Sequence, residues 1–147
     1  MTAARGAPSS GANNGHDGRL VLVVEDDPET RHFLVDALTH HGFRTEGAHN
    51  GFQALEKLFT LLPDLVLADI AVPGIDGIEL CRRLRADTRT RSIPVLAITG
   101  YDDRHYRDRA MLAGADRVLN KPCDLDTLLQ AVRELVGKAR EKLELGR

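Results

Sequence analysis

The strongest constraint on the fold of this chain is the apolar run at 64–69 (DLVLAD), which ends in a carboxylate and leads into the turn-rich segment 70–77 (IAVPGIDG). A short apolar run between turn-forming residues is typical of a strand buried on both faces, as in a parallel sheet. Asp69 would then lie at the carboxyl end of the strand, where open α/β sheets hold their ligands. Asp also caps helices, but the next helix is expected only after Gly77, too far along the chain for Asp69 to cap it. We therefore interpret Asp69 as a functional carboxylate.

Four further segments have the composition of strands. Residues 20–24 (LVLVV) and 95–99 (VLAIT) are uninterrupted β-prone runs, 43–48 is a weaker and more polar edge strand, and 117–119 is a short fifth strand. Apolar residues at helical spacing follow each strand and predict helices over 28–41, 51–62, 78–86, 102–112 and from 124 onward. Strict alternation of strands and helices predicts an α/β fold, a doubly wound five-stranded parallel sheet with helices on both faces.

The helical segments also predict which side chains pack against the sheet. At helical spacing, one face carries Phe33, Leu34, Ala37 and Leu38 in the first helix and Ala54, Leu55, Leu58, Phe59 and Leu62 in the second. The third and last helices have similar stripes, made of Ile78, Leu80, Cys81 and Leu84 and of Leu128, Leu129, Val132, Leu135 and Val136. The fourth is crowded with charges, and only Tyr106, Ala110, Met111 and Leu112 are available to face a core. Asp27 and Asp124 are expected to cap the first and last helices.

Length and composition narrow the class of protein. The 147 residues suffice for one domain, expected over 19–137, between a disordered tail at 1–18 and a helical extension or tail at 138–147. A net charge of −2 without a concentrated basic block gives no indication of a nucleic-acid or membrane surface. Cys81 and Cys123 have neither metal-ligand spacing nor a disulfide pattern, and no segment reads as a membrane span or secretory signal. We therefore expect a protein of the reducing cytoplasm.

Polar residues follow the buried strands at the points where they end. Glu25 and Asp26 follow the first strand, Asp69 ends the third, Thr99 ends the fourth and Lys121 follows the fifth. In the flavodoxin-like strand order 2-1-3-4-5, these ends lie side by side at one edge of the sheet. Three carboxylates placed together repel one another, so we expect a cation among them. Mg²⁺ fits best, because it prefers oxygen ligands and no His lies at these strand ends.

A carboxylate beside Mg²⁺, with a lysine and a hydroxyl nearby, is suited to phosphoryl transfer. Asp69 would attack phosphorus and form an aspartyl phosphate, since carboxylates act as nucleophiles in such chemistry. Mg²⁺ and Lys121 would neutralise the charge on the phosphoryl group, and Thr99 would donate to one of its oxygens. No separate base is required, because a carboxylate is ordinarily ionised at neutral pH.

In order and spacing, several segments resemble the receiver domain of two-component response regulators, the CheY-like single-domain type. They are 23–28 (VVEDDP), 64–69 (DLVLAD), 72–77 (VPGIDG), 93–95 (IPV) with Ile98-Thr99, 114–116 (GAD) and Lys121-Pro122. The resemblance covers about residues 19–137. It implies the same fold, with the strand order 2-1-3-4-5.

The resemblance also implies roles for the residues at the strand ends. Asp69 corresponds to the phosphoacceptor, which takes its phosphoryl group from the phosphohistidine of a sensor histidine kinase or a histidine phosphotransfer protein. Asp26 corresponds to the direct Mg²⁺ ligand, and Glu25 to a partner that acts largely through water. The backbone carbonyl of Ala71 would be a further ligand, which gives a metal site of Glu25, Asp26, Asp69 and Ala71. The chain is then a phosphoprotein rather than an enzyme, with only weak self-phosphorylation from small donors and self-dephosphorylation.

The same resemblance assigns the residues that surround the phosphoryl group. Thr99 resembles the switch hydroxyl that moves toward it, and Lys121 the invariant cation, with a cis bond expected before Pro122. Ala71 and Tyr101 occupy the two positions that tune how readily water attacks the phosphoaspartate. Because Ala71 neither orients water nor carries charge, and Tyr101 is able to shield the site, we expect slow self-dephosphorylation.

Two departures from the family pattern concern the readout and a thiol. Val118 stands where the family has Tyr or Phe, so the coupling of Thr99 to an aromatic switch is absent, and the signal must travel through the loop after 95–99 and the helix that follows. Cys123 stands where Phe is common. We interpret Cys123 as a small buried apolar filler, with a redox sensor as the alternative.

These observations favour a stand-alone receiver whose output is a partner protein or a homodimer. The expected face consists of the helix at 102–112, the strand at 117–119 and the last helix. Two alternatives stay open. A phosphatase of the haloacid dehalogenase type also forms an aspartyl phosphate, but it needs a second Asp where this chain has Ala71. A receiver-like interaction module that works without phosphorylation would predict the loss of an acid, the Thr or the Lys, and all of them are present.

Overall fold

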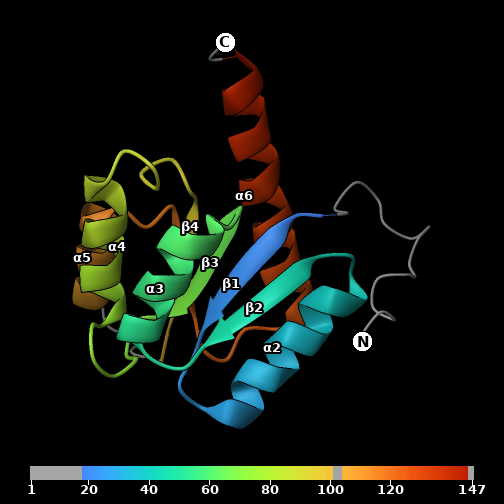
Figure 1. Cartoon of the computed structure of the whole chain (residues 1–147). Helices are drawn as coiled ribbons and strands as arrows, with labels where there is room; N and C mark the ends of the chain where they lie inside the picture. Colours follow the sequence, from blue (N-terminus) through green and yellow to red (C-terminus); the bar gives the residue numbers. More distant parts are fainter. Residues whose placement is uncertain (1–17, 101–103, 146–147) are drawn as a thin grey trace.

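The computed structural model describes residues 18–100 and 104–145, with side chains as far as 138. Within these ranges, strands and helices alternate along the chain (Figure 1). The elements are β1 (Leu20–Val24), α2 (Pro28–His40), β2 (Arg44–Ala48), α3 (Gly51–Leu61), β3 (Leu65–Asp69), α4 (Gly77–Ala86), β4 (Val95–Thr99), α5 (Arg104–Ala113), β5 (Arg117–Asn120) and α6 (Leu125–Leu145). The strands form one parallel sheet of order β2-β1-β3-β4-β5, which confirms the predicted fold.

The sheet is buried on both faces, as the apolar runs predict. In β1, Leu22 and Val24 belong to one core cluster, together with residues of α3, α4 and α5, whereas Val21 and Val23 belong to the other, with residues of α2 and α6. Figure 1 shows α3, α4 and α5 on one side of the sheet, with α6 running behind it. Every residue of β1, β3 and β4 is buried. A run without alternation is therefore the correct signature of these central strands.

Asx side chains begin four of the helices. In each case a side-chain oxygen accepts a backbone N–H from three residues further on, in Asp27 for α2, Asn50 for α3, Asp76 for α4 and Asp124 for α6. These contacts satisfy donors that have no partner inside the helix. The predicted caps at Asp27 and Asp124 are confirmed, and each fixes the start of a helix directly after a polar strand end.

Four side chains that were expected in the core lie at the surface instead. Phe33 is 58% exposed, Leu62 48%, Met111 46% and Leu112 87%. Leu62 is displaced because it terminates α3 in a left-handed conformation, with φ at 48°. In α5 the packed face is narrow, since only Ala110 and Ala113 are buried among the helical residues. Phe33 falls outside the narrow buried face of α2, which consists of Leu34, Ala37 and Leu38.

Element boundaries differ from the expected ones by small shifts. β2 begins at Arg44 rather than 43, and β5 extends to Asn120. α6 continues past Gly137 to Leu145, in line with the helical extension that was one of the two expectations for this segment. Apart from Gly18, the tail expected at 1–18 lies outside the described residues, as does Tyr101. None of the helices in the described ranges combines the length and the apolar composition that crossing a membrane requires.

Arg85, at the end of α4, ties together the loops at the edge of the sheet opposite Asp69. Its guanidinium donates to the carbonyl oxygens of Gly114 (3.0 and 2.7 Å), Ile93 (2.6 Å) and Arg91 (2.8 Å), and forms an ion pair with Asp116 at 2.7 Å. Gly114 adopts a φ of +119°, and a Cβ there would lie 2.6 Å from Arg85 Cγ. The loops before β4 and β5 therefore depend on one side chain and on a glycine that makes room for it.

The two cysteines lie in different environments, and burial raises the pKa of both thiols. Cys81 is buried in the core, and burial raises its pKa to about 11. Cys123 is only partly buried, against the core cluster under α6, so it fills the edge of the core rather than its interior. Burial, followed by the charge of Asp124, raises the pKa of Cys123 as well. Since the thiolate is the reactive form, both environments disfavour redox chemistry.

We expect Arg85→Ala to lower the free energy of unfolding by about 2 to 4 kcal/mol, because it leaves several carbonyls without a charged donor. Urea denaturation followed by circular dichroism measures this change. Arg83→Ala is the matched control on the same helix. The Arg83 side chain is 51% exposed and, among the described residues, forms an ion pair with Glu79 alone, so its removal is expected to cost less than about 1 kcal/mol. Equal losses in the two variants would contradict the role given to Arg85.

The thiols are expected to react slowly with iodoacetamide in the folded protein. At pH 8 a thiol with a pKa of about 11 is ionised in only about one molecule in a thousand, so Cys81 should stay unmodified until the chain unfolds. Cys123 should be modified more slowly than in urea, with a rate that rises as the pH is raised. Mass spectrometry after tryptic digestion reads both sites. Faster modification of Cys123 in the folded protein would instead support the redox-sensor alternative.

Candidate functional site

The carboxyl edge of the sheet brings the predicted site residues together. Asp69 ends β3, which lies between β1 and β4, and its backbone pairs with Ile98. Glu25 directly follows β1 and Thr99 ends β4. Glu25, Asp69 and Thr99 are buried, at 3%, 8% and 1% exposure. Three polar side chains are thus buried at one edge of the sheet. Burial of polar groups is unfavourable unless they form hydrogen bonds or ion pairs, so each of them needs a partner.

Lys121 supplies the central partner. Its Nζ donates to Asp69 Oδ2 at 2.6 Å and to Glu25 Oε1 at 3.1 Å. Its backbone N–H donates to the carbonyl oxygen of Thr99 at 2.7 Å, which attaches the end of β5 to the end of β4. The bond from Lys121 to Pro122 is cis, as the resemblance implies.

The second oxygen of each buried carboxylate is held by the backbone. Asp69 Oδ1 accepts the N–H of Ala71 at 2.9 Å, and Glu25 Oε2 accepts the N–H of Asp27 at 3.1 Å. Both side chains are therefore fixed at both oxygens, one by lysine and one by the chain itself. This arrangement keeps the two carboxylates oriented toward a common centre.

Three carboxylates meet at that centre. Glu25, Asp26 and Asp69 each offer an oxygen within 4.8 Å of the other two, and Asp26 is exposed whereas the others are buried. One lysine against three acids leaves an excess of negative charge that a divalent cation would balance. A donor set made only of oxygens suits a hard ion, so these residues fit the expected Mg²⁺.

The electrostatics follow from burial and from the close charges. Burial raises the pKa of Glu25, and the charge of Asp69 adds to this effect against the opposing hydrogen bond from Asp27. For Lys121, burial alone would lower the pKa, but the hydrogen bonds and charges of Asp69 and Glu25 outweigh it, so the pKa is raised. The ammonium form of Lys121 is therefore favoured. The ionised form of Glu25 stays disfavoured by burial, and a bound cation would offset that cost.

The remaining site predictions have different outcomes. Ala71 is exposed and contacts Asp69 through its N–H, whereas the role of its carbonyl as a metal ligand stays a prediction. Val118, in the aromatic position of the family, is buried in the core at 4% exposure. Tyr101, the proposed shield of the site, lies outside the described residues.

Two arginines contact the ends of the strands that carry the site, and the sequence did not predict these contacts. Arg107 of α5 donates to the carbonyl oxygen of Val118 at 3.1 Å and to Asn120 Oδ1 at 3.2 Å. Arg31 of α2 donates to the carbonyl oxygen of Glu25 at 2.8 Å. The usable signal for Arg31 was its place in the first turns of the helix after the acidic loop, where a long side chain can fold back onto that loop.

The comparisons with known proteins agree with this geometry. Residues 21–133 match the family model described as the response regulator receiver domain. The response regulator MprA of Mycobacterium ulcerans is 39% identical over 124 residues, which cover 84% of this chain and 52% of that protein. MprA of Mycobacterium avium is 36% identical over 120 residues, covering 82% and 52%. The chain thus spans about half the length of the curated relatives it matches.

Solved structures resemble the chain over most of its length. A signal receiver domain of a signal transduction histidine kinase from Syntrophus aciditrophicus has a TM-score of 0.78 at 34% identity and covers 82% of this chain and 92% of its own. A putative response regulator from Chloroflexus aurantiacus has a TM-score of 0.78 at 31% identity, covering 81% and 98%. The family match, the strand order and the convergence of Asp69, Glu25 and Lys121 agree, and the chain belongs to the response regulator receiver domain family of two-component systems.

Proposed function

We propose that Asp69 accepts a phosphoryl group from the phosphohistidine of a sensor histidine kinase or a histidine phosphotransfer protein, and that the phosphorylated chain signals by binding a partner. The observation that carries this proposal is the contact of Lys121 Nζ with Asp69 and Glu25, within a cluster of three carboxylates whose oxygens could bind a divalent ion. The same three functions, a nucleophile, a fixed cation and a place for a divalent ion, are what phosphoryl transfer requires of a protein.

The reaction needs little from the chain beyond alignment and charge. An Asp69 oxygen attacks phosphorus, the P–O bond forms as the P–N bond breaks, and the electron pair of that bond stays on the donor imidazole. Bound Mg²⁺, held by Glu25, Asp26 and Asp69, would neutralise charge on the phosphoryl oxygens. Lys121, whose Nζ lies 2.6 Å from Asp69 Oδ2, would also neutralise part of this charge. Thr99, buried at the end of the neighbouring strand, would donate a hydrogen bond from its hydroxyl to a phosphoryl oxygen.

The proposed function is signalling rather than turnover. The residue two positions after Asp69 is Ala71, which carries no acid to activate water or a leaving group. Self-dephosphorylation is therefore proposed to be slow, so that the phosphoryl group persists long enough for a partner to respond. A cytoplasmic location, expected from the unpaired Cys81 and Cys123, belongs to the same proposal.

The readout is proposed to use the face formed by α5, β5 and α6, through a partner protein or a second copy. Val118 lacks the ring that would rotate in other receivers, so the response has to pass through the β4–α5 connection and α5 itself. The hydrogen bonds from Arg107 to Val118 and Asn120 support this route, because they tie α5 to the strand that leads into Lys121.

Incubation with acetyl phosphate and Mg²⁺ is expected to add one phosphoryl group to the chain, because the acid is already fixed beside its cation. Intact-mass spectrometry measures the adduct and, after removal of the donor, its persistence. Asp69→Asn should abolish the gain, whereas Asp36→Asn, which alters an exposed acid on α2, should not. An unmodified wild-type chain would favour an interaction module that works without phosphorylation. Continuous hydrolysis of many phosphate esters would favour a phosphatase.

Mg²⁺ is expected to stabilise the folded chain, since the acidic cluster exists only when β1 and β3 are paired. A ligand at a hundred times its Kd adds about 2.7 kcal/mol to the free energy of unfolding. Thermal denaturation with and without MgCl₂, at constant ionic strength, detects this change. Asp26→Asn should remove most of the effect, and Glu29→Gln, an exposed acid in the first turn of α2, should leave it intact. Equal stabilisation of wild type and Asp26→Asn would argue against the proposed ligand set.

A further inference from the structure

We propose that Arg31 is a positioning residue for the metal site, which orients the carboxylate of Asp26 by holding the peptide that precedes it. The inference rests on the proposed function, because it concerns the Mg²⁺ that Glu25, Asp26 and Asp69 would bind. It adds a residue from α2 to a site otherwise made of strand ends. Four features support it: the Asp26 carboxylate has no partner among the described residues, Arg31 holds the preceding peptide, Gly47 leaves room for the Arg31 side chain, and the charge of Arg31 alone would disfavour a bound cation.

The carboxylate of Asp26 differs from those of Glu25 and Asp69 in its hydrogen-bond partners. Both oxygens of Glu25 and both of Asp69 are engaged by Lys121 and by backbone N–H groups. Within the described residues, the carboxylate of Asp26 has neither a hydrogen bond nor an ion pair, and the residue is exposed. The direction of its side chain is therefore set by the backbone that carries it.

That backbone is held on both sides of Glu25. The Glu25 N–H donates to the carbonyl oxygen of Ala48 in β2 at 2.9 Å. The Glu25 carbonyl oxygen accepts from Arg31 Nη1 at 2.8 Å, and the same nitrogen lies 3.5 Å from the Asp26 carbonyl oxygen. Because a peptide unit is planar, fixing the Glu25 carbonyl also fixes the N–H and Cα of Asp26. Arg31 thus orients the peptide plane between Glu25 and Asp26, and with it the Cα that carries the Asp26 side chain.

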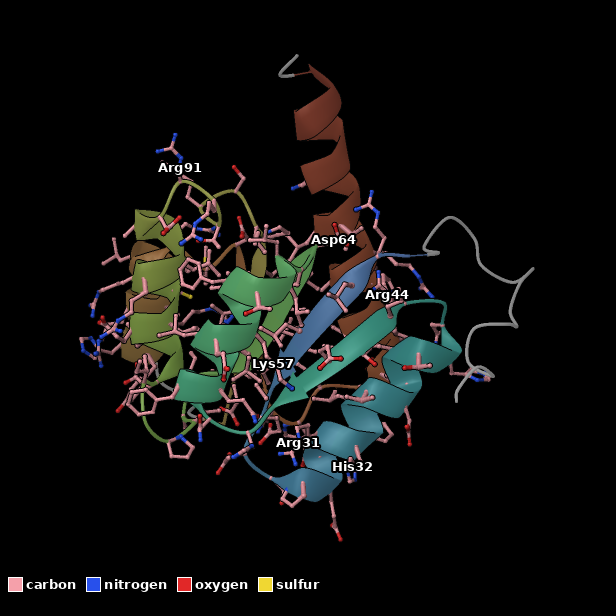
Figure 2. The ribbon with its side chains drawn as sticks, in the orientation of Figure 1. Arg31, His32, Arg44, Lys57, Asp64 and Arg91 are labelled. Carbon is pink, nitrogen blue, oxygen red and sulfur yellow. The ribbon has the colours of Figure 1, made fainter. Side chains whose placement is uncertain are left out.

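Gly47 leaves the space in which the Arg31 side chain lies. Figure 2 shows Arg31 extending from α2 toward the ends of β1 and β2. Its methylene groups lie against Gly47 of β2, where an added Cβ would be 3.2 Å from Arg31 Cδ. Any side chain at Gly47 would therefore press on Arg31. The helix itself is anchored nearby, since the Arg31 N–H donates to the Asp27 carbonyl oxygen at 2.9 Å.

The charge of Arg31 acts against a bound cation, and this separates two explanations. A guanidinium near a Mg²⁺ site repels the metal, so removing it should strengthen Mg²⁺ binding if charge were its only influence. If Arg31 instead positions Asp26, removing it should weaken binding. The two explanations predict changes of opposite sign, and a single titration distinguishes them.

The test is a Mg²⁺ titration of the full chain by isothermal titration calorimetry, with wild type, Arg31→Ala, Arg31→Lys and Gly47→Ala. Loss of an outer residue that orients a metal ligand typically costs 10- to 100-fold in affinity, so we expect Arg31→Ala to weaken Mg²⁺ binding by about tenfold. Arg31→Lys, which restores one donor, should recover part of the affinity. Gly47→Ala keeps the guanidinium but requires the Arg31 methylene groups to move slightly, and should weaken binding by less than Arg31→Ala does.

Lys57→Gln is the matched control, because Lys57 is another cation that donates to a backbone carbonyl, that of Gly47, at 2.6 Å. It changes the net charge equally but does not touch the loop that carries Asp26, so Mg²⁺ affinity should stay within about twofold of wild type or increase. The amide resonance of Asp26 in metal-free protein gives a second readout. It should shift in Arg31→Ala and not in Lys57→Gln.

The outcomes separate this inference from the proposed function. If wild type fails to bind Mg²⁺, the proposed function and the inference both fall. If wild type binds and Arg31→Ala binds equally or more tightly, only the positioning role is overturned. Where Arg31→Ala does not fold, Arg31→Met carries the test, because it keeps an apolar stem but removes the charge and the donor: a weakened affinity supports positioning, and an equal or tighter one contradicts it.

Discussion

Lys121 lies between two buried carboxylates, 2.6 Å from Asp69 and 3.1 Å from Glu25. Moving an unpaired carboxylate out of water costs several kcal/mol, so neither acid would stay buried without that ammonium group. Lys121 follows β5, yet Glu25 follows β1, and two strands, β3 and β4, lie between β5 and β1 in the sheet. The contact thus exists only in this strand order, with β5 attached to β4 through the hydrogen bond from the Lys121 N–H to Thr99.

One ammonium group cannot balance the charge of three carboxylates. The strand ends therefore carry an excess of negative charge, which distinguishes a candidate metal site from a neutral buried ion pair. Burial already raises the pKa of Glu25, and the charge of Asp69 raises it further. The cluster is held together by Lys121 and by two backbone N–H groups, with the exposed Asp26 at its open side. A second lysine would have reduced the excess to one negative charge and so weakened the attraction for a divalent ion. Under the proposed function, the residual charge would attract a hard divalent ion to the point where Asp69 would react.

Much of this arrangement was predictable because it depends on patterns that are local in the sequence. The apolar runs ending at Val24, Asp69 and Thr99 identify strands buried on both faces, and parallel strands bring their carboxyl ends to one edge. Lys121 and Glu25 are 96 positions apart, yet the topology places them in contact. The exposure of Leu112 was not predictable, because composition does not show how narrow a packed helix face is. Contacts from arginine to distant carbonyls were also missed, since any carbonyl can accept them.

The cations around the site divide into those that meet carboxylates and those that meet the backbone. Lys121 donates to two carboxylates and so reduces the charge available to a metal. Arg31 donates to the carbonyl oxygen of Glu25 instead, at 2.8 Å, and the carboxylate of Asp26 stays without a partner in the described structure. Had the guanidinium paired with Asp26 directly, it would have occupied the position that a metal needs. An arginine directed to the main chain can therefore order an acidic loop while preserving the negative charge on which ion binding depends.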